Sequence, residues 1–381
     1  MSTPIHLDVL ILYNQAIVKS ASDTLCNSPT PFAPGSKNEE YNTVYGYFLE
    51  TCQKHNLSAG FSTSVDIIGP GTCRSFWKFD GKVWSKVNTP CFSSQIFDKF
   101  SPTRKKGKSR RRLLFSSANI RPFNDPSLFE LFFDKQKTYD KLSKYSIPTI
   151  SLNIPTFKGV KIACKNLAKL TYQHPSSSDF SQDIVMKDRF GAGGRRIYKF
   201  KPTQIKQILS VVLKNINISY IIQPFTKFDQ GFSYNQCKAS TDIRLIYLNG
   251  KIIQSYIRVA KPGEFRCNEH QGGLLTYLSL DKLPIRLVAK SNLIAKILNK
   301  KHSLYTLDFI ISNNGNAYFL EGNTGPGLDW DTSRLKNEIE AKKLIDMIVE
   351  EFAIRSKADT DNLQKTQTPL TQDTLPSVYL N

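Results

Sequence analysis

Hydrophobic positions follow two different spacings along this chain, and together they predict a mixture of strands and helices. Short apolar runs, which are typical of buried strands, occupy Leu7–Tyr13, Ser64–Ile68, Asp183–Lys187, Tyr220–Phe225, Ser303–Ile311 and Ala317–Leu320. Apolar residues three and four positions apart, which give a helix one buried face, recur in Tyr41–His55, Val160–Tyr172, Thr203–Lys214, Ile285–Leu298 and Leu335–Ile354. Strands and helices mixed in this way predict an α/β or α+β fold.

The most informative stretch is a predicted hairpin within Thr241–Asn268. Two runs rich in Ile, Leu, Tyr and Val flank Asn249-Gly250, a pair that favours a tight turn because both turn positions need a positive φ. Charged residues interrupt these runs at Asp242, Arg244 and Arg258. By themselves they are typical of an antiparallel pair with one solvated face, and a binding surface is the alternative.

Length and composition indicate a globular protein of two or three units. The 381 residues are 40% hydrophobic and 11% aromatic, which is enough for more than one core. No apolar run approaches the roughly 20 residues that span a bilayer, and no basic segment precedes the first apolar run, so neither a membrane anchor nor a signal peptide is predicted. The seven cysteines, without a CxxC pair, are typical of reduced thiols and predict a cytoplasmic location.

Positive charge is in excess, with 52 Lys and Arg against 32 Asp and Glu and a formal net charge of +20. The densest run, residues 104–112, is predicted as an exposed loop that either docks phosphate or an acidic peptide or serves as a solvated connector. Nucleic-acid binding is disfavoured because no aromatic residue interleaves the run. The predicted domains are 1–122, an N-terminal α/β domain, and 123–355; residues 356–381, rich in Thr, Gln and Pro, are predicted to be a disordered tail.

A glycine-rich loop is predicted between two strands, directly after Lys187. The residues Asp188–Arg196 include Gly191, Gly193 and Gly194, and glycines let backbone N–H groups approach phosphate oxygens. The segment is neither a Walker A sequence nor GxGxxG. By itself it is therefore either a phosphate-binding loop or an ordinary turn.

Three oxygen-bearing side chains gather in the last predicted strand pair. Asp308 lies inside an apolar strand, where an unpaired carboxylate is costly. Glu321 and Asn323 are two positions apart at the end of the neighbouring strand and so point to the same face. Such a set suits Mg²⁺, which prefers oxygen ligands; a salt-bridged strand edge is the alternative.

In combination, these motifs resemble the ATP-grasp superfamily, and most closely its RimK-type glutamate ligases. The resemblance runs from about Phe123 to Phe352 and is carried by Phe123-Asn-Asp-Pro126, Asp134-Lys135, Val185-Met-Lys187 with Gly191-Ala-Gly-Gly194, Asp242-Ile-Arg244, Gly263-Glu-Phe-Arg-Cys-Asn268 with Gln271-Gly-Gly273, Leu307-Asp308, and Leu320-Glu-Gly-Asn323 with Pro326-Gly327. It implies an ATP-grasp domain with a glycine-rich-loop subdomain at about 135–218 and a metal- and nucleotide-binding subdomain at about 219–355. The preceding α/β domain is assigned by position alone.

The resemblance also implies a reaction, in which ATP activates a carboxylate as an acylphosphate and an amine then forms an amide bond. The amine would be an amino acid such as glutamate, and the carboxylate would belong to a small molecule, a peptide or an acidic protein tail. Implied catalytic residues are Arg244 and Arg258, and the implied cofactors are ATP and two Mg²⁺ or Mn²⁺ ions held by Asp308, Glu321 and Asn323. Implied nucleotide contacts are Lys135, Lys187, Gly191, Gly193, Gly194, Gln223, Pro224, Phe225, Asp242, Arg266 and Asn268.

Two positions depart from the family pattern. Gln223-Pro-Phe225 lacks the acidic residue that is usual in the adenine-binding strand, and Gly322 replaces a residue that is commonly β-branched. A small-molecule kinase on the same fold and a non-catalytic ATP-binding protein are the alternative functions. The sequence leaves the oligomeric state open, including a homo-oligomer.

Overall fold

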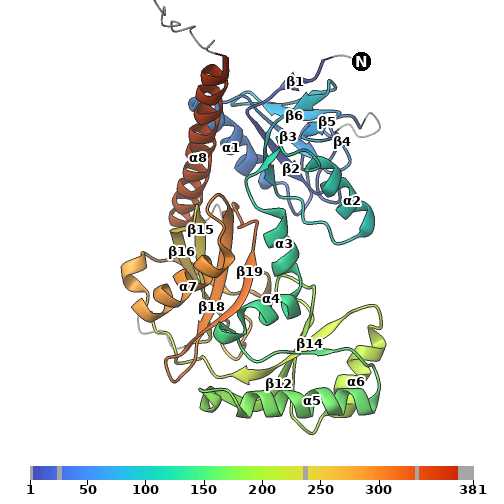
Figure 1. Ribbon diagram of the computed structural model, residues 1–381, viewed down its shortest axis with the longest axis vertical. Coiled ribbons are helices and arrows are strands. Elements are labelled where there is room, and N and C mark those ends of the chain that lie inside the picture. Colours follow the sequence, from blue (N-terminus) through green and yellow to red (C-terminus); the bar gives the residue numbers. More distant parts are fainter. Residues whose placement is uncertain (1–2, 24–27, 235–238, 331–333, 368–381) are drawn as a thin grey trace, which may run out of the picture. The chain divides into compact units, whose positions relative to one another are not determined.

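The computed structural model of the chain describes residues 3–23, 28–234, 239–330 and 334–367. It divides into two compact units (Figure 1): Met1–Ile96, Pro102–Arg121 and Lys342–Asn381 form the first, and Phe97–Ser101 and Pro122–Ala341 form the second. Near residue 122 the division lies where the sequence suggested it. At the other end it lies at Ala341 rather than at 355. Helical residues beyond that point contact the N-terminal part; the hydroxyl of Tyr47, for example, donates to Asp346 at 2.8 Å.

The first unit is built on a six-stranded sheet with the order β10-β9-β2-β3-β6-β7. Its strands are β2 (Val9–Tyr13), β3 (Ala59–Thr63), β6 (Phe76–Phe79), β7 (Trp84–Val87), β9 (Gln95–Asp98) and β10 (Arg121–Pro122). Helix α1 (Tyr41–Lys54) buries its apolar face, as its spacing predicts. A second, four-stranded sheet has the order β1 (Ile5–His6), β8 (Cys91–Phe92), β5 (Thr72–Cys73) and β4 (Ile67–Gly69).

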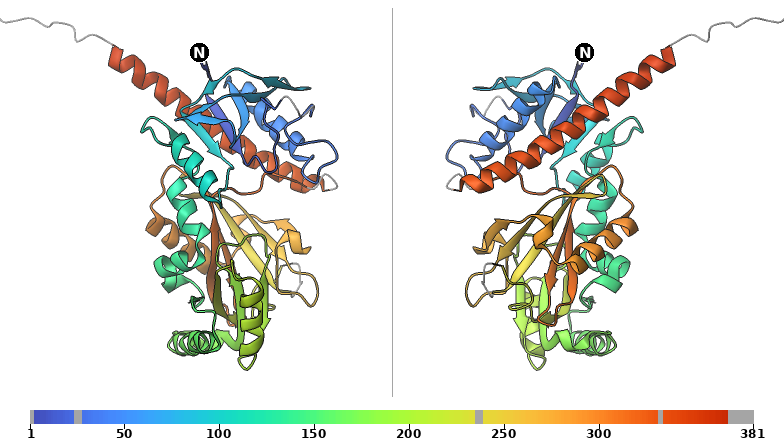
Figure 2. Two further views of the ribbon diagram at one scale, coloured as in Figure 1. Left: turned by 90° about the vertical axis from the view of Figure 1, so that its right-hand side faces the viewer. Right: turned by 90° about the vertical axis from the view of Figure 1, so that its left-hand side faces the viewer.

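Three predictions for the first unit are wrong. The strand expected at Ser64–Ile68 is a turn as far as Asp66, because this buried carboxylate collects hydroxyl donors from Thr63 at 2.5 Å and Ser20 at 2.7 Å. The basic run 104–112 is not a loop but lies mostly in α2 (Lys105–Leu114). The tail predicted from residue 356 is helical at first, since α8 (Leu335–Gln367) is one continuous helix (Figure 2); residues 368–381 lie outside the described residues.

The second unit contains two antiparallel sheets. The first has the order β11 (Ile150–Leu152), β14 (Tyr220–Thr226), β12 (Phe180–Asp188) and β13 (Ile197–Phe200). Helices α5 (Phe157–Tyr172) and α6 (Ile205–Lys214) pack against it through a shared apolar core. Strand β14 continues past Pro224 to Thr226. Pro224 pairs with Ile184 of β12, next to a shift in register that interrupts the regular ladder.

The other sheet has the order β17 (Leu274–Tyr277), β16 (Lys251–Val259), β15 (Thr241–Leu248), β18 (Leu304–Ile311) and β19 (Ala317–Asn323). The predicted hairpin turn is confirmed, with φ of 53° at Asn249 and 76° at Gly250. The solvated face is not, because β15 is central and almost every residue in it is buried. Helices α3 (Pro126–Phe133) and α7 (Ile285–Leu298) contribute to the core beneath the sheet.

The remaining helices are short. Helix α4 (Lys135–Leu142) follows α3, and single 3₁₀ turns occur at Ser143–Tyr145, Ser177–Asp179, Glu269–Gln271 and Leu280–Lys282. Within the described ranges, no helix has both the length and the apolar character that crossing a membrane requires.

Candidate active site

A buried network of charges links the three central strands of the second sheet. Asp242 is the cross-strand partner of Arg258, and Arg244 is the partner of Asp308. Because these residues alternate with apolar ones, their side chains share one face of the sheet. Arg258 donates to both oxygens of Asp242 at 2.7 and 2.9 Å, and Arg244 donates to both oxygens of Asp308 at 2.6 and 2.5 Å.

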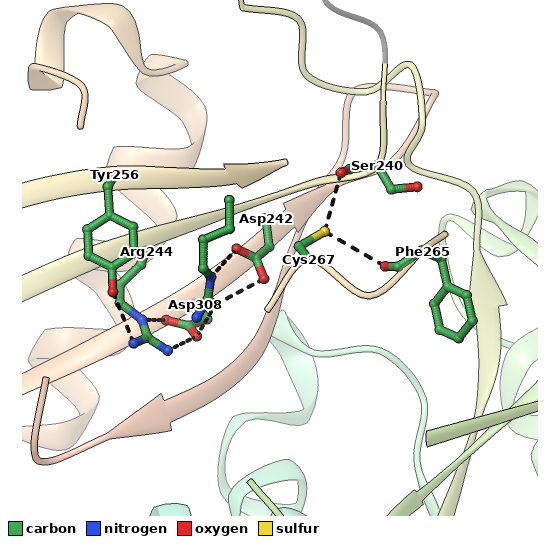
Figure 3. Close-up of polar contacts among 8 residues, drawn as sticks. Ser240, Asp242, Arg244, Tyr256, Phe265, Cys267 and Asp308 are labelled. Atoms are coloured by element: carbon green, nitrogen blue, oxygen red, sulfur yellow. Dashed lines mark hydrogen bonds and ion pairs between the residues drawn. The ribbon is translucent and has the colours of Figure 1, made fainter. Parts of the chain in front are cut away.

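Asp308 joins the two pairs into one network (Figure 3). Its Oδ2 also accepts from Arg258 at 2.8 Å, and Arg244 donates to the hydroxyl of Tyr256 at 3.1 Å. Burial raises the pKa of Asp308, but the two guanidinium groups outweigh it and the pKa is lowered. Two carboxylates and two guanidinium groups therefore balance in charge, which makes their burial tolerable.

A cavity opens beside this network and is lined by charges of both signs. Lys135, Lys187, Arg195 and Arg258 supply the positive charge, and Asp188, Asp242, Asp308 and Glu321 supply the negative charge. The charged side-chain groups of Lys187 and Glu321 form no hydrogen bond or ion pair with any of the described residues. Burial, with Lys135 adding to it, outweighs Glu321 and lowers the pKa of Lys187 to about 8.

The glycine-rich loop forms one wall of this cavity. Gly191, Ala192 and Gly194 line it, and the ammonium group of Lys135 donates to the carbonyl of Gly191. At Gly194, φ is 70°, and a Cβ atom there would stand 2.6 Å from Oδ1 of Asn268. The loop is thus packed directly on the segment that follows β16, a contact that only glycine permits.

An ion pair fixes the base of this loop. Asp134 caps the start of α4 by accepting from the backbone of Gln136 and Lys137. The same carboxylate binds Arg189 through Nε at 2.6 Å and Nη2 at 2.7 Å. One side chain therefore orients both Lys135, the first residue of α4, and the glycine-rich loop.

A second, largely apolar cavity adjoins the first and shares Lys187, Gln223, Asp242 and Asn268 with it. Gln223 donates to Thr149 at 2.8 Å, while its Oε1 is buried and accepts no hydrogen bond from the described residues. The apolar lining consists of Ile147, Val185, Ile197, Pro224, Phe225, Phe228, Phe265, Cys267, Ile310 and Leu320. An apolar lining with one unpaired acceptor suits an aromatic ring that carries a donor.

The three predicted metal ligands are only partly available to a cation. Glu321 is the cross-strand partner of Asp308, and Asn323 follows on the same face. The described residues offer no partner to the side chains of Glu321 and Asn323, whereas both oxygens of Asp308 are paired with arginine. The set is all oxygen and fits Mg²⁺ chemically, provided that Asp308 exchanges an arginine contact. The described residues contain no cluster of three or more His, Cys, Asp or Glu that could hold a metal.

Most of the predicted site residues meet at the two cavities, and three do not line either. Arg244 contacts Asp308 behind the lining, Gly193 lies in the loop without facing the cavity, and Asn323 lies one step further along β19. Those that line the cavities are Lys135, Lys187, Gly191, Gly194, Gln223, Pro224, Phe225, Asp242, Arg258, Arg266, Asn268, Asp308 and Glu321.

Sequence reasoning assigned no role to Glu264, Asn124 and Lys99, which support the site. Glu264 pairs with Arg266 at 2.6 Å, and this arginine lowers the pKa of Glu264 to about 2. Asn124 donates to the carbonyl of Thr324 at 2.7 Å, and Lys99 donates to that of Pro326 at 2.5 Å. The contacts of Asn124 and Lys99 join residues 200 or more positions apart, so no local pattern indicates them. Glu264 and Arg266 are two positions apart, and the short motif that contains both could have indicated their ion pair.

Comparison with known proteins identifies the fold. Residues 130–348 match the model of the RimK-like ATP-grasp domain. A protein from Shewanella halifaxensis named "Probable alpha-L-glutamate ligase" is 27% identical over 217 residues, which cover 56% of this chain and 41% of that protein. This chain therefore spans less than half of that relative's length.

Two solved structures share the fold at low sequence identity. D-alanyl-alanine synthetase A from Vibrio cholerae has a TM-score of 0.55 at 14% identity, covering 93% of this chain and 100% of the other. A RiPP-associated ATP-grasp ligase from Chryseobacterium gregarium, in complex with ADP and a leader and core peptide, has a TM-score of 0.53 at 14% identity, covering 91% and 97%. The predicted α+β fold and the resemblance stated from the motifs are both confirmed.

Proposed function

This chain belongs to the RimK-like ATP-grasp family, and we propose that it is an ATP-dependent ligase that joins a carboxylate to the amino group of an amino acid such as glutamate. The observation that carries the proposal is one cavity in which Lys135, Lys187 and Arg258 face Asp308 and Glu321. Phosphoryl transfer needs charge neutralisation and positioning more than it needs a nucleophilic side chain. The cavity offers both.

The nucleotide would occupy the two adjoining cavities. Its base would lie against the apolar lining, where Oε1 of Gln223 is an acceptor for an exocyclic amine. Gln223 occupies the strand in which the family usually has an acidic residue. Its phosphates would lie in the charged cavity, with Lys135, Lys187 and the amides of the glycine-rich loop as donors.

Arg258 and Arg244 would act on the reacting carboxylate. Arg258 lines the charged cavity, so its guanidinium is the group that can hold the acylphosphate and the oxyanion formed by amine attack. Arg244 lies behind it and contacts Asp308, so we assign it the role of orienting that carboxylate. The ammonium of the incoming amino acid would give its proton to solvent water, and the neutral amine would then attack the acylphosphate carbonyl and displace inorganic phosphate.

Mg²⁺ would be held by Glu321 and Asn323, joined by Asp308 after exchange of an arginine contact. When bound, it would neutralise the charge of the transferring phosphoryl group. Glu321 is the ligand best prepared for this role, because its carboxylate lines the cavity without a partner among the described residues.

A product screen tests this function. The purified chain is incubated with ATP, Mg²⁺ and amino acids, alone and with peptides that end in acidic residues, while ADP and phosphate release are measured. We expect ADP release that depends on an amino acid and on a carboxylate acceptor, and a product whose mass equals the two substrates less one water. Transfer of phosphate to a hydroxyl without release of inorganic phosphate would instead identify a kinase.

We also propose that the protein acts in the cytoplasm. The five cysteines given a structural description, Cys52, Cys73, Cys91, Cys164 and Cys267, are free thiols, as expected in a reducing compartment. A peptide or protein acceptor is supported by the peptide in the Chryseobacterium complex.

A further inference from the structure

Helix α2 concentrates positive charge to a degree that its own folding does not explain. Six of its ten residues are Lys or Arg. From Lys99 to Asn124 the sequence contains nine basic residues and no acidic one. No local carboxylate can therefore neutralise the helix from within its own stretch of chain.

The order of the charges opposes helix formation. Arg104 occupies the N-cap without a side-chain hydrogen bond, and the first turn carries Lys105 and Lys106 but no acidic residue. Cations at this end are repelled by the partial positive charge of the helix N-terminus. Like charges four apart, such as Lys108 and Arg112, add further repulsion. Local rules broken in this way are expected where a surface serves a function.

The exposed cations lie on one side of α2. Arg111 and Leu114 are buried and hold the helix to its unit, at 5% and 0% exposure. Lys105, Lys106 and Arg112 are exposed. We call these three residues the basic face of α2. Lys105 and Arg112 are seven positions apart and lie on the same side of the helix, and Lys106 lies about 100° around the helix from Lys105. Arg112 also donates to the hydroxyl of Ser109 at 3.4 Å.

The chemistry of this face fits carboxylates. Arginine binds a carboxylate through two parallel hydrogen bonds, and lysine contributes a mobile charge. Helix α2 contains no aromatic side chain on which a base could stack, so an acidic polypeptide fits better than a single-stranded nucleic acid.

We propose that the basic face of α2 docks an acidic polypeptide acceptor; this rests on the ligase function proposed above. Joining glutamate to a carboxylate consumes one carboxylate and one ammonium and leaves the two carboxylates of glutamate. Each addition, driven by conversion of ATP to ADP and phosphate, therefore makes the acceptor more negative by one charge. A basic docking face would hold such a product more tightly with each addition.

Peptide binding without nucleotide tests the docking separately from catalysis. The probe is a fluorescein-labelled oligoglutamate peptide, and its anisotropy is measured with the full chain at low salt. In K105E/K106E/R112E we expect binding to weaken about tenfold or more, since three attractive charges become repulsive. The matched control is K158E/K161E/K165E on α5, whose lysines are also exposed and whose net charge changes equally; there we expect a change within about twofold.

The neutral variant K105Q/K106Q/R112Q is the control for a loss of binding that is caused by misfolding. It should show an intermediate loss of binding with an unchanged melting temperature. Equal losses in the α2 and α5 variants, or no loss in the α2 variants, would overturn the proposal. Displacement of the peptide by a single-stranded oligonucleotide at a lower concentration than unlabelled peptide would also overturn it. ADP release with a neutral acceptor, measured on the same variants, reports on the ligase function independently.

Discussion

At Asp308, one fully buried carboxylate binds two guanidinium groups from two neighbouring strands. Its partner across the strand pair, Glu321, has the same chemistry but no such contacts among the described residues. The two carboxylates therefore differ in what they do for the folded state. Asp308 compensates buried positive charge, whereas Glu321 leaves its own charge available.

Two conservative substitutions should separate these roles. Glu321→Gln should abolish ADP formation and change the free energy of unfolding by less than about 0.5 kcal/mol. Asp308→Asn should also lose activity, but at a cost of about 3–5 kcal/mol, because Arg244 and Arg258 lose a counter-charge in a buried network. Chemical denaturation and an ADP assay on both variants provide the check. Full turnover in Glu321→Gln would refute the metal assignment.

Lys187 gives the site a pH dependence. Its folded pKa of about 8 lies below the value of about 10.4 in an unfolded chain. Between these values the unfolded chain binds a proton that the folded chain does not, so stability rises with pH across this window. Below pH 8 the lysine is charged in both states, and its burial is a constant cost.

Lys187→Met should therefore stabilise the protein at pH 7 by roughly 1–3 kcal/mol, since each pKa unit corresponds to about 1.4 kcal/mol. This advantage should shrink as the pH approaches 10. ATP affinity should fall in the parent protein as pH rises through 8, because the neutral amine no longer attracts phosphate, and the variant should lose this dependence. Urea unfolding and calorimetric titration at both pH values measure the two effects. A stability difference independent of pH would contradict the prediction.

Gly322 shows why a departure from the family pattern can be structural. A Cβ atom at this position would stand 2.4 Å from Cζ of Phe132 in α3, so the ring fills the space that a side chain would need. The glycine and the phenylalanine are expected to compensate each other.

Gly322→Ala should therefore destabilise the protein by about 1–3 kcal/mol through overpacking. Combined with Phe132→Leu, the loss should be smaller than the sum of the single losses. Gly325→Ala is the matched control, because the nearest atom to its Cβ, on Lys99, is at an ordinary 3.6 Å, and it should be nearly neutral. Thermal unfolding of the four variants suffices, and strict additivity would show that the ring and the glycine are uncoupled.

At the level of elements, the sequence predicted helices and turns that depend on neighbouring residues, and it missed features that depend on contacts between distant residues. The turn at Asn249-Gly250 and helix α7 were predicted correctly, because a positive φ and an apolar face are local properties. The burial of both faces of β15 was missed, since the partners of its polar side chains are on β16 and β18. Helix α2 was missed because the repulsion among its charges disfavours a helix. It is held in place by its buried residues, Arg111 and Leu114.

The sequence of the glycine-rich loop indicated phosphate binding, but it did not indicate the ion pair that holds the loop in place. Arg189→Met removes the ion pair with Asp134. It should lower the free energy of local opening of the loop by about 1–3 kcal/mol, the usual cost of losing a buried charged hydrogen bond. Tryptic cleavage after Arg195 or Arg196, both exposed, should accelerate several-fold, and the KM for ATP should rise. Lys201→Met, which removes an exposed ion pair with Asp183, is the control and should leave both unchanged. Equal cleavage rates in the two variants would place the anchor elsewhere.

At the scale of the whole molecule, the chain contains two units with separate cores. Both cavities of the candidate site are lined by the second unit alone. A ligand that binds only the folded site stabilises the unit that contains it.

ATP should therefore shift one of two unfolding transitions in differential scanning calorimetry. At a ligand concentration about 100 times Kd the second unit should gain about 2.7 kcal/mol, while the transition of the first unit stays in place. Glu321→Gln, assayed with ATP and Mg²⁺, should reduce the shift without abolishing it. A single transition that moves as one would show that the two units unfold together.

The contact between Lys135 and the carbonyl of Gly191 has a consequence for the time course of nucleotide entry. A phosphate that recruits this ammonium group must first break its bond to the loop, so association includes an internal step whose rate does not depend on ligand concentration. The observed rate of binding should consequently level off as ATP is increased, with a ceiling set by how often the lysine leaves the loop.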